Sequence, residues 1–358
     1  MLNDKPWYFI LAIDGGGIRG IIPASALVGL EQLIDGPIAE NFDLIVGTST
    51  GAFIALALTV PGTDGTPQYS AEDILGFYTD STNDAQIFTL YDGSNTGGPP
   101  ASWLDALDHP KYASSGVETF LSDKYGSATL ADAVTSVSCV SYQISGTPGP
   151  FFFQSWMASQ PGQNFLMSDA GRASGAAPLY FPPVTITSTD NSFTGTFVDG
   201  GVTANDPALV AYAEAVQLLE SQGDNIENYN VWLVSIGTGE VSTAINPGDG
   251  GIWGWLSGDS LPMVTLNGPA QSTDFIAQSM LQSEKDKYYS RIEVPLQGTT
   301  PNGQSYSCAP EMDDWTQDNI QQLQLAGQVA GGPSVLADTV RIAQERRSRR
   351  AAKVRRAG

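Results

Sequence analysis

Histidine and cysteine are the rarest chemically reactive residues in this chain. Among 358 residues there are one histidine, His109, and two cysteines, Cys139 and Cys308. Two cysteines cannot form a disulfide framework or supply the four ligands of a structural zinc site. We therefore expect neither disulfide nor metal, and we expect a cytoplasmic protein.

Long apolar runs are also missing, since no stretch approaches the ~20 apolar residues of a membrane-spanning helix. The apolar run Trp7–Ile13 is short and lies directly before a glycine-rich motif. Its removal with a signal peptide would delete what the pattern predicts to be a core strand. We therefore expect no signal peptide and no membrane span.

Basic residues are scarce outside the C-terminal tail. The net charge is −22, yet residues 341–358 alone carry +7, which leaves −29 on the rest of the chain. A body this acidic repels phosphates, so general binding of nucleic acid is not expected. The simplest role of the acidity is solubility.

The first sixty residues alternate between predicted strands and helices. Trp7–Ile13 and Phe42–Val46 are apolar strands, each followed by a glycine-containing turn. Helices are predicted from Pro23 and over Ala52–Val60. This strand–helix–strand–helix order predicts an α/β fold with a parallel sheet that helices cover on both faces.

The later chain continues this pattern after a region rich in glycine and proline. Residues 61–112 are predicted to be a loop-rich insertion or lid. Further strands are predicted near Val137–Ile144, Phe151–Trp156, Thr194–Val198 and Val231–Ile236, with a helix after Pro207. We expect one catalytic domain over residues 1–325, followed by a C-terminal helix and basic tail over 326–358.

A serine lies where the second strand should turn into a helix. Gly47, Ser49 and Gly51 form a G-x-S-x-G pattern between two apolar segments. A nucleophile elbow requires this context, because the sharp turn exposes the hydroxyl while the glycines let strand and helix approach. The alternative is an ordinary turn that contains a serine. The context favours Ser49 as a nucleophile.

Three glycines, Gly15, Gly16 and Gly17, follow the first strand. In a parallel sheet their loop would lie beside Ser49, and its N–H groups would stabilise an oxyanion. Gly15–Gly20 also matches the G-x-G-x-x-G dinucleotide fingerprint, which requires an acidic residue closing a second strand about 20 residues later. The second strand here leads to Ser49 instead, so nucleotide binding remains the alternative.

Asp199 is the preferred general base. His109 precedes a proline in a predicted surface turn, and its position in the chain does not follow the Ser–acid–His order of α/β-hydrolases. Asp199 ends an alternating strand and precedes Gly200, so it can approach a serine closely. A carboxylate can accept the hydroxyl proton if burial raises its pKa. Asp-Gly is also a strong turn signal, so Asp199 alone would not establish a site.

Together, these motifs resemble the patatin-like phospholipase family, which combines D-G-G-G-x-R-G, G-x-S-x-G and D-G-[GA] in this order. The matching stretches are Asp14–Gly20, Gly47–Gly51, Arg172–Pro182, Asp199–Pro207 and Ser235–Gly239, and the resemblance covers about residues 7–300. One departure is Ala52, where many members have a further glycine.

The resemblance implies a three-layer α/β/α fold with a mostly parallel central sheet. It implies a Ser49–Asp199 dyad without histidine, and an oxyanion hole in the Gly15–Gly17 loop. Gly47, Gly51 and Gly200 would support this site, and Arg19 would hold the loop or meet a lipid phosphate. The implied reaction is hydrolysis of acyl esters of glycerophospholipids or related lipids through an acyl-enzyme, without metal or cofactor.

The expected partner is a lipid substrate at a membrane or micelle surface. Trp253 and Trp255 lie between glycines, and tryptophan favours membrane interfaces. The basic tail from Arg341 would attract anionic lipid, although a buried aromatic pair and a solvated tail are the simpler interpretations. An acyltransferase on the same fold, with an alcohol replacing water, and a storage or interaction protein remain alternatives.

Overall fold

A computed structural model describes residues 5–34, 36–91, 109–241, 260–282 and 287–346. The strands are β1 Trp7–Ile13, β2 Leu44–Thr48, β3 Ser136–Gln143, β4 Gly149–Gln154, β5 Val184–Thr187, β6 Thr194–Asp199, β7 Asn230–Ile236, β8 Lys287–Ile292, β9 Gln297–Thr299 and β10 Ser305–Ser307. The helices are α1 Ile21–Ile34, α2 Ile38–Asn41, α3 Thr50–Thr59, α4 Ala71–Thr79, α5 Ser81–Ile87, α7 Ser114–Tyr125, α8 Met167–Ser174, α9 Gly201–Ala204, α10 Ala208–Ser221, α12 Ser260–Leu281 and α13 Gln317–Ala330. Short 3-10 turns are η1 Gly17–Gly20, η2 Leu130–Asp132, η3 Ser155–Met157 and η4 Ile226–Asn228.

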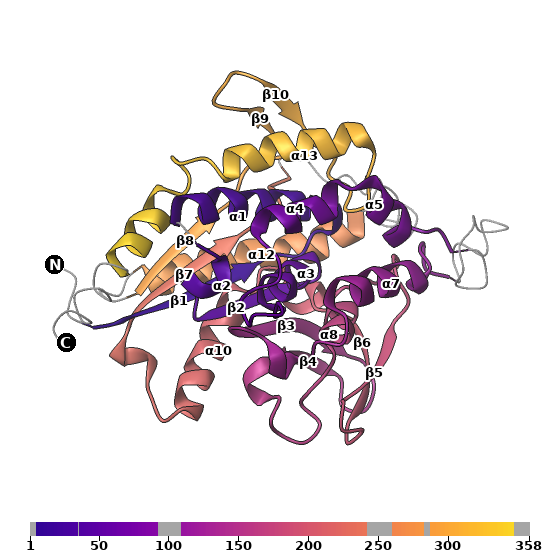
Figure 1. Cartoon of the computed structure of the whole chain (residues 1–358). Helices are drawn as coiled ribbons and strands as arrows, with labels where there is room; N and C mark the ends of the chain where they lie inside the picture. The colour runs from indigo at the N-terminus through magenta and orange to yellow at the C-terminus, as the bar shows by residue number, and fades with distance from the viewer. Residues whose placement is uncertain (1–4, 35, 92–108, 242–259, 283–286, 347–358) are drawn as a thin grey trace.

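One eight-stranded sheet forms the centre of the molecule (Figure 1). Its order is β5-β6-β3-β2-β1-β7-β8, and β4 pairs with β3 as well. Strands β3, β2, β1, β7 and β8 run parallel, whereas β4, β5 and β6 add antiparallel pairs at one side. The predicted mostly parallel sheet is therefore confirmed.

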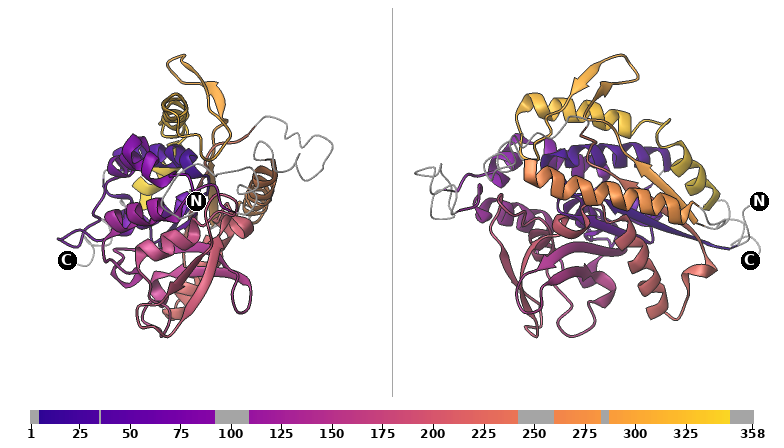
Figure 2. Two further views of the ribbon diagram at one scale, coloured as in Figure 1. Left: turned by 90° about the vertical axis from the view of Figure 1, so that its right-hand side faces the viewer. Right: turned by 180° about the vertical axis from the view of Figure 1, so that it is seen from behind.

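Strand β1 shows why an uninterrupted apolar run predicts a central strand. Phe9 and Leu11 belong to the core on the α1 and α3 side, whereas Ile10 and Ala12 belong to the core on the α10 side. Successive strand residues point to opposite faces, so a strand buried on both faces needs apolar residues throughout. Helices lie on both sides of the sheet (Figure 2). The three-layer α/β/α prediction is confirmed.

The segment 61–112 is more helical than its composition predicts. It contains α4 and α5. A capping box starts α4, since Ser70 Oγ accepts from the Asp73 N–H at 3.2 Å and Asp73 Oδ2 accepts from the Ser70 N–H at 2.9 Å. The prediction of a loop is wrong for residues 71–87. The glycines and prolines on which it was based lie before α4 or in residues 92–108, and the latter are outside the described residues.

The predicted domain boundary after residue 325 falls inside α13. This helix packs along α1 (Figure 1), and a Cβ at Gly327 would lie 2.4 Å from Ser25 Oγ. Residues 337–346 are also helical, and Arg346 forms an ion pair with Asp43. The described part of the tail is therefore packed onto the catalytic body, while residues 347–358 lie outside the description.

One described segment, Gly17–Ile34, is long and apolar enough to cross a membrane by length and composition alone. This corrects the expectation that no segment meets that criterion. The segment is 61% buried inside the protein. Its α1 part packs against α4 and α13. This packing is that of a core helix.

Glu214 is a buried carboxyl that connects α10 to the sheet. Its Oε1 accepts hydrogen bonds of 2.9 Å from both Ser138 Oγ on β3 and Gln154 Nε2 on β4. Burial raises the pKa of Glu214 to about 7, although the two hydrogen bonds oppose this shift. Oε2 has no hydrogen-bond partner among the described residues. The charged form is therefore poorly stabilised in the folded protein.

We predict that Glu214→Gln stabilises the protein at alkaline pH. The folded pKa lies above the unfolded value, so the wild-type carboxyl loses stability as pH rises from about 4.5 to about 7. Glutamine resembles the protonated acid and removes this loss, which is on the order of 1–3 kcal/mol. Urea unfolding at pH 5 and pH 8 measures the difference. Equal effects of the substitution at both pH values would contradict the prediction.

Candidate active site

Ser49 occupies a strained turn between β2 and α3. Its φ of 55° and ψ of −121° lie where residues with a side chain are rare. A Cβ at Gly47 would lie 2.2 Å from Gly51 O, and one at Gly51 would lie 2.1 Å from Ile13 O. Strand and helix could not approach this closely with larger residues. The turn has the geometry of a nucleophile elbow.

The sheet brings Asp199 to this turn. Thr48 at the end of β2 pairs with Val140, and Asp199 at the end of β6 pairs with the adjacent Ser141. The Asp199 carboxyl accepts a hydrogen bond of 2.7 Å from the Gly201 N–H, and it lies close enough to the Ser49 side chain for that side chain to lower its pKa. The two residues predicted as a dyad thus lie together although 150 positions separate them.

Burial sets the proton affinity of Asp199. The residue is 4% exposed, and this burial raises its pKa to about 6. The Ser49 side chain and the hydrogen bond from Gly201 act in the opposite direction. A Cβ at Gly200 would lie 2.3 Å from Val140 O, so only glycine lets the chain turn this close to β3. The carboxyl is therefore more basic than an exposed aspartate.

The glycine loop after β1 lies beside Ser49, but its three glycines differ. The Gly15 N–H donates to Asn205 O at 3.1 Å and is therefore occupied. Gly16 and Gly17 line the cavity next to Ser49. Among the described residues, no protein acceptor is found for their N–H groups. Of the three predicted oxyanion amides, those of Gly16 and Gly17 are therefore available beside Ser49, whereas the Gly15 N–H holds the loop to Asn205.

Thr50 is a residue that the sequence analysis did not single out. It follows Ser49, begins α3 and lines the same cavity. Its N–H has no protein acceptor in the described part of the chain. The residue after the nucleophile commonly supplies an oxyanion amide, so the elbow motif itself could have identified it.

Arg19 is buried behind the glycine loop and does not reach the cavity lining. The side chain is 3% exposed. Its Nε and Nη1 have no hydrogen-bond partner among the described residues. Burial lowers the pKa of this guanidinium, while nearby Glu293 opposes that shift. Among the described residues, neither of these two nitrogens holds the glycine loop by a hydrogen bond.

The cavity beside Ser49 has a volume of about 410 Å³ and mainly apolar walls. Its sides come from the glycine loop, α3, α4, α5 and α7. Aromatic side chains such as Phe53, Phe77, Phe88 and Phe120 line it. A long apolar group bound here would place its polar end at Ser49. The helices of segment 61–112 therefore contribute walls to the site.

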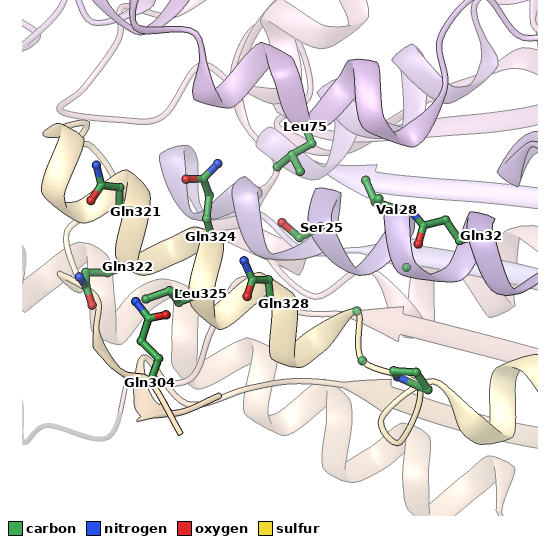
Figure 3. A pocket seen from close by; sticks show the side chains of 14 residues that line it. Ser25, Val28, Gln32, Leu75, Gln304, Gln321, Gln322, Gln324, Leu325 and Gln328 are labelled. Carbon is green, nitrogen blue, oxygen red and sulfur yellow. The ribbon is translucent and has the colours of Figure 1, made fainter. Parts of the chain in front are cut away.

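A second cavity, of about 600 Å³, lies between α1, α13 and the β9–β10 connection. Figure 3 shows its glutamine side chains, which include Gln32, Gln304, Gln324 and Gln328. None of the described residues that line it is charged. It has no nucleophile paired with a base and is distinct from the Ser49 cavity.

His109 lies outside the Ser49 cavity. Its ring is exposed and lies 4.8 Å from that of Tyr91, and it is not among the described residues that line the cavity. This position supports the expectation that histidine is not the base. Trp253 and Trp255 lie outside the described residues.

Comparison with known proteins agrees with this geometry. The model of the family described as patatin-like phospholipase matches residues 11–212. The chain belongs to the patatin-like phospholipase family. It is 31% identical to Patatin-like protein 2 of Oryza sativa subsp. japonica, over 89% of this chain and 82% of that protein. It is 36% identical to Patatin-like protein 4 of Arabidopsis thaliana, over 66% of this chain and 62% of that protein.

A solved structure of human GIVD cytosolic phospholipase A2 aligns with 95% of this patatin-like chain and 60% of the human chain, at 10% identity and a TM-score of 0.44. The family match supports a lipid hydrolase. It disfavours the nucleotide-binding alternative for Gly15–Gly20.

A buried network of charged residues, centred on Arg291, lies next to the patatin-like site. Arg291 on β8 donates from Nη2 to Asp14 Oδ2 at 2.6 Å and from Nη1 to Asp14 Oδ1 at 2.9 Å. The same guanidinium contacts Asp206 Oδ2 at 3.4 Å and Glu293 Oε2 at 2.5 Å. It therefore connects the start of the glycine loop to the segment after Asp199.

Proton affinities in this network follow from burial and charge. Burial raises the pKa of Asp14, and Arg291 acts against that rise. Burial alone would lower the pKa of Arg291, but Asp14, Asp206 and Glu293 raise it. Arg291 lies beyond residue 212, where the family match ends, and no local motif marks it. Only the sheet brings it to the site.

We predict that Arg291→Met strongly destabilises the protein. Removal of the guanidinium leaves three neighbouring carboxyls without their common cation, which for buried pairs costs about 3–5 kcal/mol. Urea unfolding at pH 7 measures this loss, which should shrink at acidic pH as the carboxyls become protonated. Arg341→Met is the matched control, since its ion pair with Asp338 is exposed and worth at most about 1 kcal/mol. Equal effects of the two substitutions would refute the prediction.

Proposed function

We propose that this patatin-like chain is a serine lipid acyl hydrolase of the phospholipase A type. It cleaves acyl ester bonds of glycerophospholipids or related lipids through an acyl-enzyme on Ser49, with Asp199 as general base. The observation that supports the proposal is the meeting of Ser49, in its strained turn, with the buried Asp199 carboxyl at the wall of one apolar cavity. Family membership supports the coarser class of lipid hydrolase.

The proposed reaction needs two proton transfers in each half. Asp199 accepts the proton of Ser49 Oγ as that oxygen attacks the ester carbonyl, and it returns the proton to the leaving alcohol or lysolipid. Water then attacks the acyl-enzyme and gives a proton to Asp199. The proton passes back to Ser49 Oγ when the fatty acid leaves. One carboxyl thus serves as base and acid in turn.

Oxyanion stabilisation is assigned to backbone amides. The N–H groups of Gly16, Gly17 and Thr50 border the cavity at Ser49. Loss of a single oxyanion donor typically costs about 10²–10³ in rate, so preorganised amides supply much of the catalysis. Gly15 acts through its hydrogen bond to Asn205, which fixes the loop that carries the other two glycines.

The substrate would be taken from a membrane or micelle surface. Leu179 and Val202 line the cavity and are nevertheless 55% and 42% exposed, so they form an apolar rim. An apolar rim lowers the cost of transferring an acyl chain from a lipid aggregate into the protein. This contact would be peripheral.

We predict that Ser49→Ala and Asp199→Asn each reduce ester hydrolysis by about 10³- to 10⁶-fold without unfolding the protein. The first removes the nucleophile, and the second removes the group that accepts its proton. Turnover of a phospholipid panel by mass spectrometry, beside labelling with a fluorophosphonate, measures both effects. His109→Ala is the control and should retain turnover. Near-normal hydrolysis by either dyad variant would exclude the proposed mechanism.

We also predict an acidic limit to activity. Asp199 must be ionised to accept the Ser49 proton, and its pKa is about 6. kcat/KM should therefore be constant above this pH and should fall about tenfold per pH unit below it. A soluble short-chain ester, assayed alongside fluorescence to monitor folding, gives the profile. Activity that persists unchanged to pH 4 in a folded protein would show that Asp199 is not the base.

A further inference from the structure

Three carboxyl groups line the cavity beside Ser49, and two of them are paired. They belong to Asp84, Asp199 and Asp313. Asp199 accepts a hydrogen bond from the Gly201 N–H and lies beside the Ser49 side chain. Asp313 Oδ2 accepts hydrogen bonds from Lys111 Nζ and, at 2.6 Å, from the Tyr112 hydroxyl. The third carboxyl, that of Asp84, has no such partner within the described part of the chain.

Asp84 on α5 is buried in apolar surroundings without a partner. It is 1% exposed, and its Oδ2 has no hydrogen-bond partner among the described residues. Phe77 and Phe88 line the same cavity as its side chain. Burial raises the pKa of Asp84 to about 7, with Asp80 adding to the rise. Nothing in the described protein offsets the cost of burying this group.

We propose that Asp84 selects acyl chains that carry a hydroxyl group, by accepting a hydrogen bond from that hydroxyl inside the cavity. This inference rests on the proposed acyl hydrolase function and specifies its substrate class. An unsubstituted chain offers the Asp84 carboxyl no hydrogen-bond donor, whereas a hydroxylated chain in the same cavity supplies one. Sites with a buried polar group discriminate strongly against ligands that lack its partner.

The position of Asp84 indicates where the hydroxyl must lie. Burial, and to a lesser extent the charge of Asp84, raises the pKa of Tyr78, whose hydroxyl hydrogen-bonds to Thr50 Oγ1 at 2.5 Å, next to Ser49. Asp84 lies on α5, whereas Ser49 lies in the turn before α3. We therefore expect the selected hydroxyl along the acyl chain and not beside the ester. Scanning the hydroxyl position would locate it.

The test measures binding separately from hydrolysis. Fatty acid methyl esters of one chain length, unsubstituted or with a hydroxyl at successive carbons, are titrated into Ser49→Ala protein by calorimetry. One hydroxyl position should bind about ten- to hundredfold more tightly than the plain ester. Wild-type kcat/KM on the matching p-nitrophenyl esters should show the same preference.

Variants at Asp84 and a matched carboxyl assign the effect. Asp84→Leu in the Ser49→Ala background should abolish the preference and tighten binding of the plain ester. Asp84→Asn should keep most of it, because the amide oxygen still accepts. Asp313→Asn, which changes a paired carboxyl in the same wall, should leave the ratio unchanged.

The inference is overturned if Ser49→Ala protein binds plain and hydroxylated esters equally, or if the preference survives Asp84→Leu. Hydrolysis of plain and hydroxylated esters at equal rates would likewise remove the selectivity while leaving the proposed function intact. Selective binding without any hydrolysis by wild-type protein would instead refute the proposed function.

Discussion

Val140 and Ser141 are consecutive residues of β3 that pair with different strands, and the site depends on this backbone pairing. β4 occupies the other edge of β3 at both positions, so β2 and β6 must share one edge. β2 runs parallel to β3 and β6 runs antiparallel, so their last residues approach each other. A slip of one residue in β6 would turn Asp199 to the opposite face of the sheet. The dyad geometry therefore follows from the sheet before any side chain is considered.

Close packing then holds this meeting point in a strained conformation. A residue other than glycine at a φ of 55°, as at Ser49, persists only when its surroundings leave no alternative. The glycines at 47, 51 and 200 each pack against backbone at distances that a side chain would forbid. Arg291 fixes the adjacent end of β1 through Asp14. The close packing around Ser49 therefore both makes this region rigid and holds the serine in its strained conformation.

Local sequence signals were sufficient wherever the structure is determined locally. The apolar run of β1 and the elbow at Ser49 were predicted from composition and spacing, and both elements lie where expected. Helix α4 was missed because its start depends on a capping box at Ser70, amid residues that also favour loops. The carboxyl ends of β1 and β2 were expected to meet, since parallel strands require it.

The remaining parts of the site depend on contacts between distant segments. Arg291 has no motif, and its partners Asp14 and Asp206 come from distant parts of the chain. Asp84 is an ordinary helix residue in the sequence, and only the packing of α5 against α4 and α7 buries it. The sequence also does not reveal that the Gly15 N–H donates to the backbone oxygen of Asn205, because three consecutive glycines look equivalent. Only this long-range hydrogen bond distinguishes Gly15 from Gly16 and Gly17.

One physical property, exclusion of water, connects substrate binding to chemistry in this cavity. The apolar walls that suit an acyl chain are the same walls whose burial raises the pKa of Asp199 to about 6. An acyl chain that fills the cavity removes further water, which disfavours the charged carboxylate and strengthens its tendency to take a proton. The neighbouring proton belongs to Ser49. In the proposed mechanism, substrate binding would therefore increase the basicity of Asp199 when the serine is activated, and this coupling would let a carboxylate act as the base without a histidine.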